Sequence, residues 1–270
     1  MEEVAGAWLQ NLMGIPSSAS FGFVTGGCWV WAPAYSSRSR PMPTERSSSK
    51  NPAEHWPPSR RARPSCACRR CSRCRASTSH LVRGVELADS WAADGHKWLN
   101  VPYDCGYVFC AHPDAHAAAL SYSAAYLTGQ GKPGVRSPGE FVLESSRRAR
   151  GFATYAALRQ LGRSGIADLV DRCCRLARRF ADQLASIDGV TVLNDVVLNQ
   201  VLVQFGDDDR TDQVIDAVQQ AGECWMGGTT WHGIRLMRIS VSNWSTTEAD
   251  VDRSVAAIER CCSQVVIARS

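Results

Sequence analysis

The amino-acid composition changes abruptly at two points, and these breaks limit what the 270-residue chain can fold into. Seven of the twelve prolines lie between Pro33 and Pro64, among serines and arginines, where no helical or alternating apolar pattern survives. Such a composition is typical of disordered segments and linkers. A structureless stretch of this length is uncommon inside a compact domain. We therefore predict that a core forms from residues 1–28 and 80–270, and that residues 29–79 form a low-complexity segment.

The positive charge of the chain is concentrated in the same segment. Eleven Lys or Arg residues and two Asp or Glu residues lie between Ser36 and Arg75, a local net charge of +9. Because the whole chain carries +4, the remainder carries −5. Basic arms bind phosphate backbones without sequence preference. This one has a single aromatic residue, Trp56, and no recognition helix, so we expect a solvated coil and no nucleic-acid partner.

Four of the twelve cysteines, Cys66, Cys68, Cys71 and Cys74, fall within nine residues. Structural zinc sites usually take their ligands as two pairs from separated elements. Here all four are crowded together among arginines, with no histidine at a standard offset, so we predict no metal site. A basic, cysteine-rich protein that binds zinc or nucleic acid is the alternative from another class.

Neither a signal peptide nor a membrane-spanning segment is recognisable in the sequence. The N-terminus lacks the basic-then-apolar shape of a signal peptide, and no run of about 18 apolar residues occurs. We therefore expect a cytoplasmic protein with no membrane partner and no framework of disulfides.

Apolar periodicity predicts the secondary structure on both sides of the low-complexity segment. Helices are predicted at residues 4–13, 166–187, 212–221 and 247–261, and strands at 21–24, 107–110, 190–194, 200–205 and 234–242. Gly14 with Pro16 should end the first helix, Gly222 the third, and Thr246 or Thr247 should cap the last. The alternation in the second half predicts a compact α+β domain.

One lysine has an unusual setting. Residues 90–100 read Ser-Trp-Ala-Ala-Asp-Gly-His-Lys-Trp-Leu-Asn, which puts Lys97 directly after His96 at a predicted junction between strand and loop. A lysine partly shielded from water has a lowered pKa, and its neutral amine attacks carbonyl groups. The alternative is an ordinary surface lysine beside a core tryptophan.

With its flanks, residues 89–106, this segment resembles the active-site lysine motif of the group II pyridoxal-phosphate-dependent amino-acid decarboxylases. This is the family of the aromatic-amino-acid, glutamate and tyrosine decarboxylases, and the resemblance covers about residues 2–27 and 80–259. It implies an α/β protein of the fold-type I pyridoxal-phosphate-dependent transferases. An incomplete large domain would contain residues 80–150, and a small α+β domain residues 151–270.

The resemblance also implies an activity. A Schiff base between Lys97 and pyridoxal 5'-phosphate would serve the decarboxylation of a small L-amino acid in a homodimer. A catalytically inactive remnant and another pyridoxal-phosphate enzyme, such as an aldehyde synthase or a lyase, remain as alternatives.

Two further segments are similar to the cofactor-binding parts of the family. The predicted strand at 21–24 runs into Gly26 and Gly27, and a strand followed by glycines before a helix provides backbone N–H groups for a phosphate. The resemblance implies that Gly26, Gly27 and Cys28 hold the cofactor phosphate and that His96 lies beside it. The match ends at Gly27, because Cys28 stands where the family has Ser or Thr. A packed structural histidine is the alternative for His96.

The resemblance implies roles for two more residues. Tyr126 precedes the glycine-containing stretch 128–132 and the sequence Ser-Arg-Arg-Ala-Arg at 146–150, predicted as a helix. It would protonate Cα from a mobile loop, unless it is a core tyrosine. Arg238 would clamp the substrate α-carboxylate. Two alternatives stay open: Arg235 has this role instead, or Arg238 is an ordinary solvated arginine at a strand edge.

Part of the family pattern is missing. No His-x-Asp-x-Ala sequence precedes Lys97, although in the family this region supplies a histidine that stacks on the pyridine ring and a carboxylate that pairs with its nitrogen. Our hypothesis is that residues 29–79 replace family sequence, for example through a shifted reading frame around a deletion. Residues 1–28 would then keep an N-terminal helix and a remnant of the phosphate loop.

Overall fold

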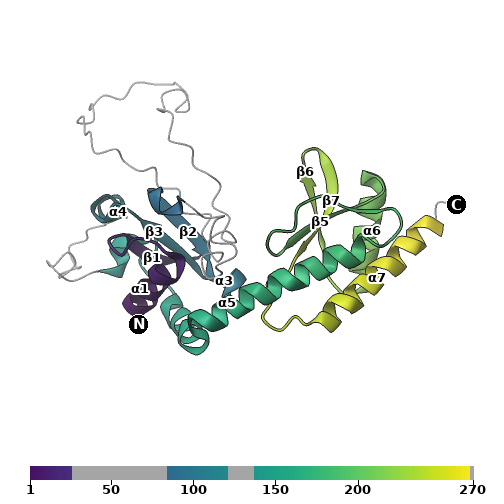
Figure 1. The fold of residues 1–270 in the computed structure, drawn as a ribbon. Coiled ribbons are helices and arrows are strands. Elements are labelled where there is room, and N and C mark those ends of the chain that lie inside the picture. The colour runs from purple at the N-terminus through teal and green to yellow at the C-terminus, as the bar shows by residue number, and fades with distance from the viewer. Residues whose placement is uncertain (26–83, 121–136, 268–270) are drawn as a thin grey trace, which may run out of the picture. The chain divides into compact units, whose positions relative to one another are not determined.

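The computed structural model describes residues 1–25, 84–120 and 137–267 (Figure 1). Contacts divide them into two compact units. Unit 1 contains residues 1–25, 84–96, 101–120 and 137–156, and unit 2 contains Lys97–Asn100 and residues 157–267. Several predicted features lie outside the described residues: Gly26, Gly27, Cys28, the cysteine cluster and Tyr126.

A three-stranded sheet forms the centre of unit 1. Its strands are β1 (Ser20–Val24), β2 (Ser90–Asp94) and β3 (Gly106–Cys110), in the order β1-β3-β2, with both outer strands antiparallel to β3. Phe23, Trp91 and Phe109 are almost fully buried. The strands predicted at 21–24 and 107–110 are thus confirmed, and their aromatic residues build the core.

Helix α1 (Glu2–Met13) packs on this sheet at very short range. The helix ends at Gly14, which has the left-handed φ of 63°, as the sequence predicts. A Cβ atom on Gly6 would lie only 2.1 Å from the ring of Phe21, so this helix position admits no side chain. The other elements of unit 1 are short: η4 (Val85–Leu87), α4 (Pro113–Leu120) and η5 (Pro138–Phe141).

Helix α5 (Arg150–Leu184) starts well before the predicted residue 166. The backbone leaves the helical conformation at Gly162 (φ 60°, ψ −173°), so two helical segments meet there, and only the second has the apolar face that reveals a helix. The helix predicted at 146–150 was wrong for its first four residues, because α5 begins at Arg150. The boundary between the two units falls at Ala156–Ala157, inside α5.

Unit 2 is built on a four-stranded antiparallel sheet. The strands β4 (Val190–Val192), β5 (Gln200–Phe205), β6 (Gly227–Trp231) and β7 (Ile234–Ser240) have the order β4-β5-β7-β6. Strand β6 was not predicted, because Gly-Gly-Thr-Thr-Trp has no buried apolar alternation and its residues are half-buried or exposed. The other three agree with the apolar pattern.

Two capped helices complete unit 2. Helix α6 (Asp208–Ala221) begins four residues earlier than predicted, because the Asp207 carboxylate accepts a hydrogen bond from Arg210 N. Helix α7 (Glu248–Ile267) follows Thr247, as predicted. Thr247 N donates to Asp250 Oδ2 at 2.8 Å, and Asp250 N donates back to Thr247 Oγ1 at 3.3 Å.

The described residues also bear on cysteines, metals and membranes. Their seven cysteines are free thiols. Within the same ranges, no group of three or more His, Cys, Asp or Glu side chains gathers as a metal site. Nor does any helix among them have the length and apolar character needed to cross a membrane.

Candidate active site

The predicted lysine lies in a one-turn helix, α3 (Gly95–Trp98), directly after β2. Gly95 N and His96 N both donate to Cys105 O, at 2.8 and 3.2 Å, which closes the turn onto the residue that precedes β3. Trp98 and Leu99 take the buried positions of the turn, and the Lys97 side chain is exposed. This corrects the expectation of a lysine partly shielded from water.

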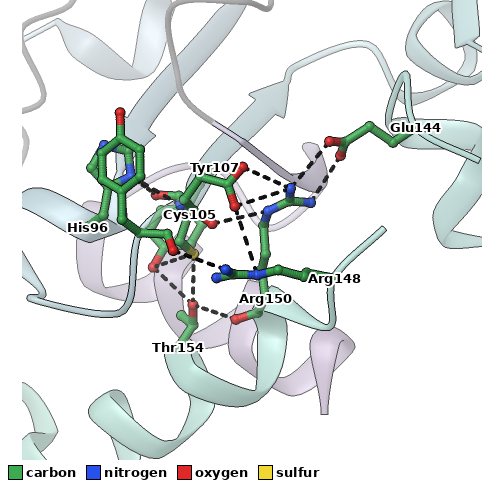
Figure 2. A network of polar contacts seen from close by, with 9 residues as sticks. His96, Cys105, Tyr107, Glu144, Arg148, Arg150 and Thr154 are labelled. Carbon is green, nitrogen blue, oxygen red and sulfur yellow. Dashed lines mark hydrogen bonds and ion pairs between the residues drawn. The ribbon is translucent and has the colours of Figure 1, made fainter. Parts of the chain in front are cut away.

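Position 95 has no room for a side chain, because the Tyr107 side chain lies directly against the Gly95 backbone. A Cβ atom on Gly95 would lie 2.0 Å from the Tyr107 hydroxyl. That hydroxyl bonds to Thr154 Oγ1 at 3.0 Å, and Thr154 donates to Arg150 O at 3.1 Å (Figure 2). Cys105 Sγ completes the cluster, and burial raises the pKa of its thiol. The lysine turn therefore starts against a buried, hydrogen-bonded wall.

The ring of His96 is held in a fixed orientation beside the lysine. Its Nδ1 lies 2.8 Å from Cys105 O and 3.1 Å from Cys105 N, and the shorter contact is the one in which Nδ1–H donates to the carbonyl. The Tyr103 ring lies against it, with centroids 4.3 Å apart. Within the described ranges, His96 Nε2 makes no hydrogen bond, so this nitrogen is available to a ligand.

Arg150 fixes the loop that supports this ring. Its guanidinium, only 4% exposed, bonds to Glu144 Oε2 at 3.0 Å, to Asp104 Oδ2 at 3.3 Å and to Asp104 O at 3.2 Å (Figure 2). The hydrogen bond from Arg150 holds the pKa of the Asp104 carboxyl below its usual range. Burial works to lower the pKa of Arg150 itself, but its hydrogen bonds to both carboxylates outweigh burial and raise it. No local pattern in the sequence predicts this cluster, since Asp104 and Arg150 are 46 residues apart in the chain.

Within unit 2, the segment Lys97–Asn100 is held by the side chain of Asn100. Asn100 has a left-handed backbone (φ 51°), which asparagine tolerates better than most residues. Its Nδ2 lies 2.9 Å from Ser242 O and 3.2 Å from Lys97 O, and its Oδ1 accepts from Trp244 N at 3.2 Å. Asn100 closes the sequence motif, but its bonds to residues 242 and 244 follow from no pattern in the sequence.

The two arginines proposed from the sequence as ligands of the substrate carboxylate, Arg235 and Arg238, differ in their ion pairing. Arg235 Nε donates to Asp212 at 2.7 Å, so its charge is engaged. Arg238 is exposed on β7, opposite Leu202 of β5 and Gly227 of β6. Among the described residues its guanidinium makes no hydrogen bond or ion pair. Of the two, Arg238 is the one available to an anionic ligand.

An open groove of about 800 Å³ lies elsewhere in unit 2. It is lined by four arginines of α5 (Arg172, Arg175, Arg178 and Arg179), by Asp182 and by the segment 244–248. Arg179 is paired with Asp252 at 2.7 Å. Lys97, His96 and Arg238 are absent from its described lining, so this groove does not bring the predicted site residues together.

Comparison with known proteins identifies the family of this architecture. The pyridoxal-dependent decarboxylase conserved domain matches residues 72–205. The 4-hydroxyphenylacetaldehyde synthase of Rhodiola rosea is 23% identical over 195 residues, which cover 69% of this chain and 39% of that protein. The aromatic-L-amino-acid decarboxylase of Drosophila lebanonensis is 22% identical over 176 residues, 65% of this chain and 44% of the relative.

Solved structures show the same fold. Oryza sativa TDC, crystallised with PLP and tryptamine, superposes with a TM-score of 0.69 at 18% identity, over 74% of this chain and 44% of that one. Catharanthus roseus tryptophan decarboxylase, in complex with L-tryptophan, gives 0.65 at 19% identity with the same coverage. The fold is therefore that of the fold-type I pyridoxal-phosphate-dependent decarboxylases, as predicted.

With the conserved domain matched over residues 72–205 as well, the resemblance to the pyridoxal-dependent decarboxylases is confirmed. The chain spans less than half the length of each of these four relatives.

Proposed function

We propose that the protein is a pyridoxal-phosphate-dependent decarboxylase of a small L-amino acid, a carboxy-lyase, with Lys97 as the residue that holds the cofactor covalently. One observation carries the proposal: an exposed lysine next to an oriented histidine, on a turn closed by two hydrogen bonds, within the segment that matches the family domain. Since the chain spans less than half of its relatives, the activity, substrate and partners are all part of this proposal.

The described residues around Lys97 fit such a cofactor. The exposed side chain of Lys97 is accessible to an aldehyde, and the neighbouring His96, as an imidazolium, would donate Nε2–H to a phosphate. When bound, pyridoxal phosphate supplies an electron sink for the bond between Cα and the carboxylate. Gly26, Gly27 and Cys28, which lie outside the described residues, are proposed as further phosphate contacts.

Two other side chains are proposed to act on the substrate. Arg238 would hold the α-carboxylate, because a guanidinium binds a carboxylate through two parallel hydrogen bonds and no described residue competes for it. Tyr126 would deliver the proton to Cα after carbon dioxide leaves. For Tyr126 the support is its sequence context alone.

An aldehyde synthase is the second candidate. The observation that favours it is that two of the relatives, from Rhodiola rosea and Arabidopsis thaliana, are aldehyde synthases at 23% identity, as near in sequence as the aromatic-L-amino-acid decarboxylases at 20–22%. Product analysis separates the two activities: a decarboxylase yields the amine, whereas an aldehyde synthase consumes dioxygen and water and yields the aldehyde with ammonia and hydrogen peroxide. Tyr126→Phe should change the ratio of the two products if Tyr126 delivers the proton.

We further propose a cytoplasmic homodimer without nucleic-acid or membrane partners. The support in unit 1 is an exposed apolar surface on α1 and the start of α5, formed by Val4, Trp8 and Phe152. The Trp8 ring stacks on Tyr155 with centroids 5.2 Å apart, so the two helices present one continuous surface. Apolar surfaces of this kind mark interaction sites. Light scattering after gel filtration would give twice the 29.5 kDa chain mass if the proposal holds.

The activity is tested by adding pyridoxal phosphate and a panel of L-amino acids to the purified protein. We expect carbon dioxide and an amine from at least one amino acid, and an absorbance band of the bound cofactor at ~420 nm. Both should be absent from Lys97→Ala and present in the control Lys50→Ala. A band without product from any amino acid would leave a cofactor-binding remnant and would refute the decarboxylase.

A further inference from the structure

We propose that Asn100 is a positioning residue, which sets how readily Lys97 reacts by tying the lysine turn to the segment after β7. The inference rests on the function proposed for Lys97 and deepens it. Asn100 itself touches neither the proposed cofactor nor the substrate and would act through the backbone of the turn.

The Asn100 amide group is saturated with backbone contacts from two separate segments. Its Nδ2 lies 3.2 Å from Lys97 O, 3.1 Å from Trp98 O and 2.9 Å from Ser242 O, and its Oδ1 accepts from Trp244 N at 3.2 Å. An amide NH2 has two hydrogens, so the three carbonyls share them. The shortest of the three contacts is the one that reaches across 142 residues.

The segment that Asn100 holds is itself rigidly anchored. Val241 N donates to Asn199 O at 3.0 Å, and the buried Asn199 donates its Nδ2 back to Val241 O at 2.8 Å. Arg172 donates to Trp244 O. Residues 241–244 are therefore held by Asn199, directly before β5, and by Arg172 of α5, so their backbone has a fixed position to which Asn100 can bond.

The tether has a chemical consequence because residues 241–244 continue directly from β7, which carries Arg238. Lys97 is proposed to hold the cofactor and Arg238 the substrate carboxylate. The same short segment, residues 241–244, therefore helps to fix the positions of both. A misplacement of reacting groups by about 1 Å costs up to about a hundredfold in rate. Loss of the tether should therefore slow the reaction of Lys97 while the bonds from Gly95 and His96 to Cys105 still close the turn.

Three variants isolate the role of the side chain. Asn100→Ala removes every side-chain bond. Asn100→Gly does the same but suits the left-handed φ of 51°, so it separates loss of the bonds from backbone strain. The matched control is Asn194→Ala, because Asn194 makes a similar set of backbone bonds to Asp195 O, Gln200 O and Leu202 N, in the connection between β4 and β5.

The first measurement needs no cofactor. Amide hydrogen exchange should become faster in residues 96–101 and 242–246 of Asn100→Ala and Asn100→Gly, and should be unchanged there in Asn194→Ala. The second measurement is the rate at which borohydride traps pyridoxal phosphate on Lys97. We expect this rate to fall about tenfold in both Asn100 variants and to stay at the wild-type value in Asn194→Ala.

The outcomes separate the two proposals. Wild-type protein that traps no cofactor on Lys97 refutes the proposed function, and the role of Asn100 with it. If the wild-type protein traps the cofactor and the Asn100 variants react at the same rate, the proposed function stands and the positioning role is refuted. Unchanged exchange in residues 242–246 likewise overturns the tether, whatever the rates.

Discussion

Gly95→Ala is the substitution whose effect follows most directly from the structure of the lysine turn. The added Cβ would lie 2.0 Å from the Tyr107 hydroxyl and 2.5 Å from its Cζ, where real Cβ atoms require more than 3 Å. Tyr107 is buried, at 2% exposure, and is bonded to Thr154, so it has no free space into which to move. The ring must shift by about 1 Å or the turn must open.

The expected cost is the sum of two effects. Overpacking of a filled core costs about 1–3 kcal/mol, and loss of the buried hydrogen bond between Tyr107 and Thr154 costs about 1 kcal/mol. We therefore expect the free energy of unfolding to fall by about 2–4 kcal/mol. Gly227→Ala is the control, because nothing lies within 4 Å of a Cβ on that strand glycine. Its effect should stay within about 0.5 kcal/mol.

Urea denaturation followed by circular dichroism measures both variants. In a double-mutant cycle, Tyr107→Phe should recover part of the loss in the Gly95→Ala background, because it removes the 2.0 Å contact and leaves the one at 2.5 Å. The reasoning fails if Gly95→Ala is as stable as Gly227→Ala, or if the tyrosine and glycine substitutions are simply additive.

Four further outcomes follow from other contacts of the described residues. Arg150→Met should lower the free energy of unfolding by about 2 kcal/mol in urea titrations, because it leaves partly buried carboxylates unpaired. Because the folded-state pKa of Asp104 is depressed, its contribution is present above about pH 4 and is lost as the pH falls; Arg150→Met should flatten this loss. Hydrogen bonding lowers the pKa of Asp252 to about 2, so Asp252→Asn should flatten the decline in the urea midpoint between about pH 4 and pH 2. Arg238→Gln should reduce kcat/KM about a hundredfold and leave cofactor attachment intact, whereas Arg235→Gln should affect stability alone.

The sequence predicted the elements whose apolar residues face a single core. Helix α1 with its stop at Gly14, strands β1, β3 and β5, and the Thr247 cap of α7 all follow from local periodicity and capping residues. Helix starts were predicted too late, because the first turns of α5 and α6 are rich in charged and small residues, and no apolar face marks them. The half-exposed strand β6 was missed for the same reason.

The candidate site was predicted only in part, because a motif reveals residues that are neighbours in the chain. His96 and Lys97 directly follow strand β2, at the strand end that the sequence predicts, and their roles stay predictions. The supports of the turn, Thr154, Arg150 and Ser242, come from distant positions and are set by packing. The exposure of Lys97 was missed because the buried positions go to Trp98 and Leu99, which the sequence shows as neighbours but does not orient.

The direct test of the central claim is the site at which the chain captures pyridoxal phosphate. The sequence has only three lysines, Lys50, Lys97 and Lys132, so borohydride reduction followed by peptide mapping gives a clear answer. We expect stoichiometric label on Lys97, none above background on the other two, and loss of the label in Lys97→Ala. Label spread evenly over the three lysines, or no label at a small molar excess of the cofactor, would contradict the account.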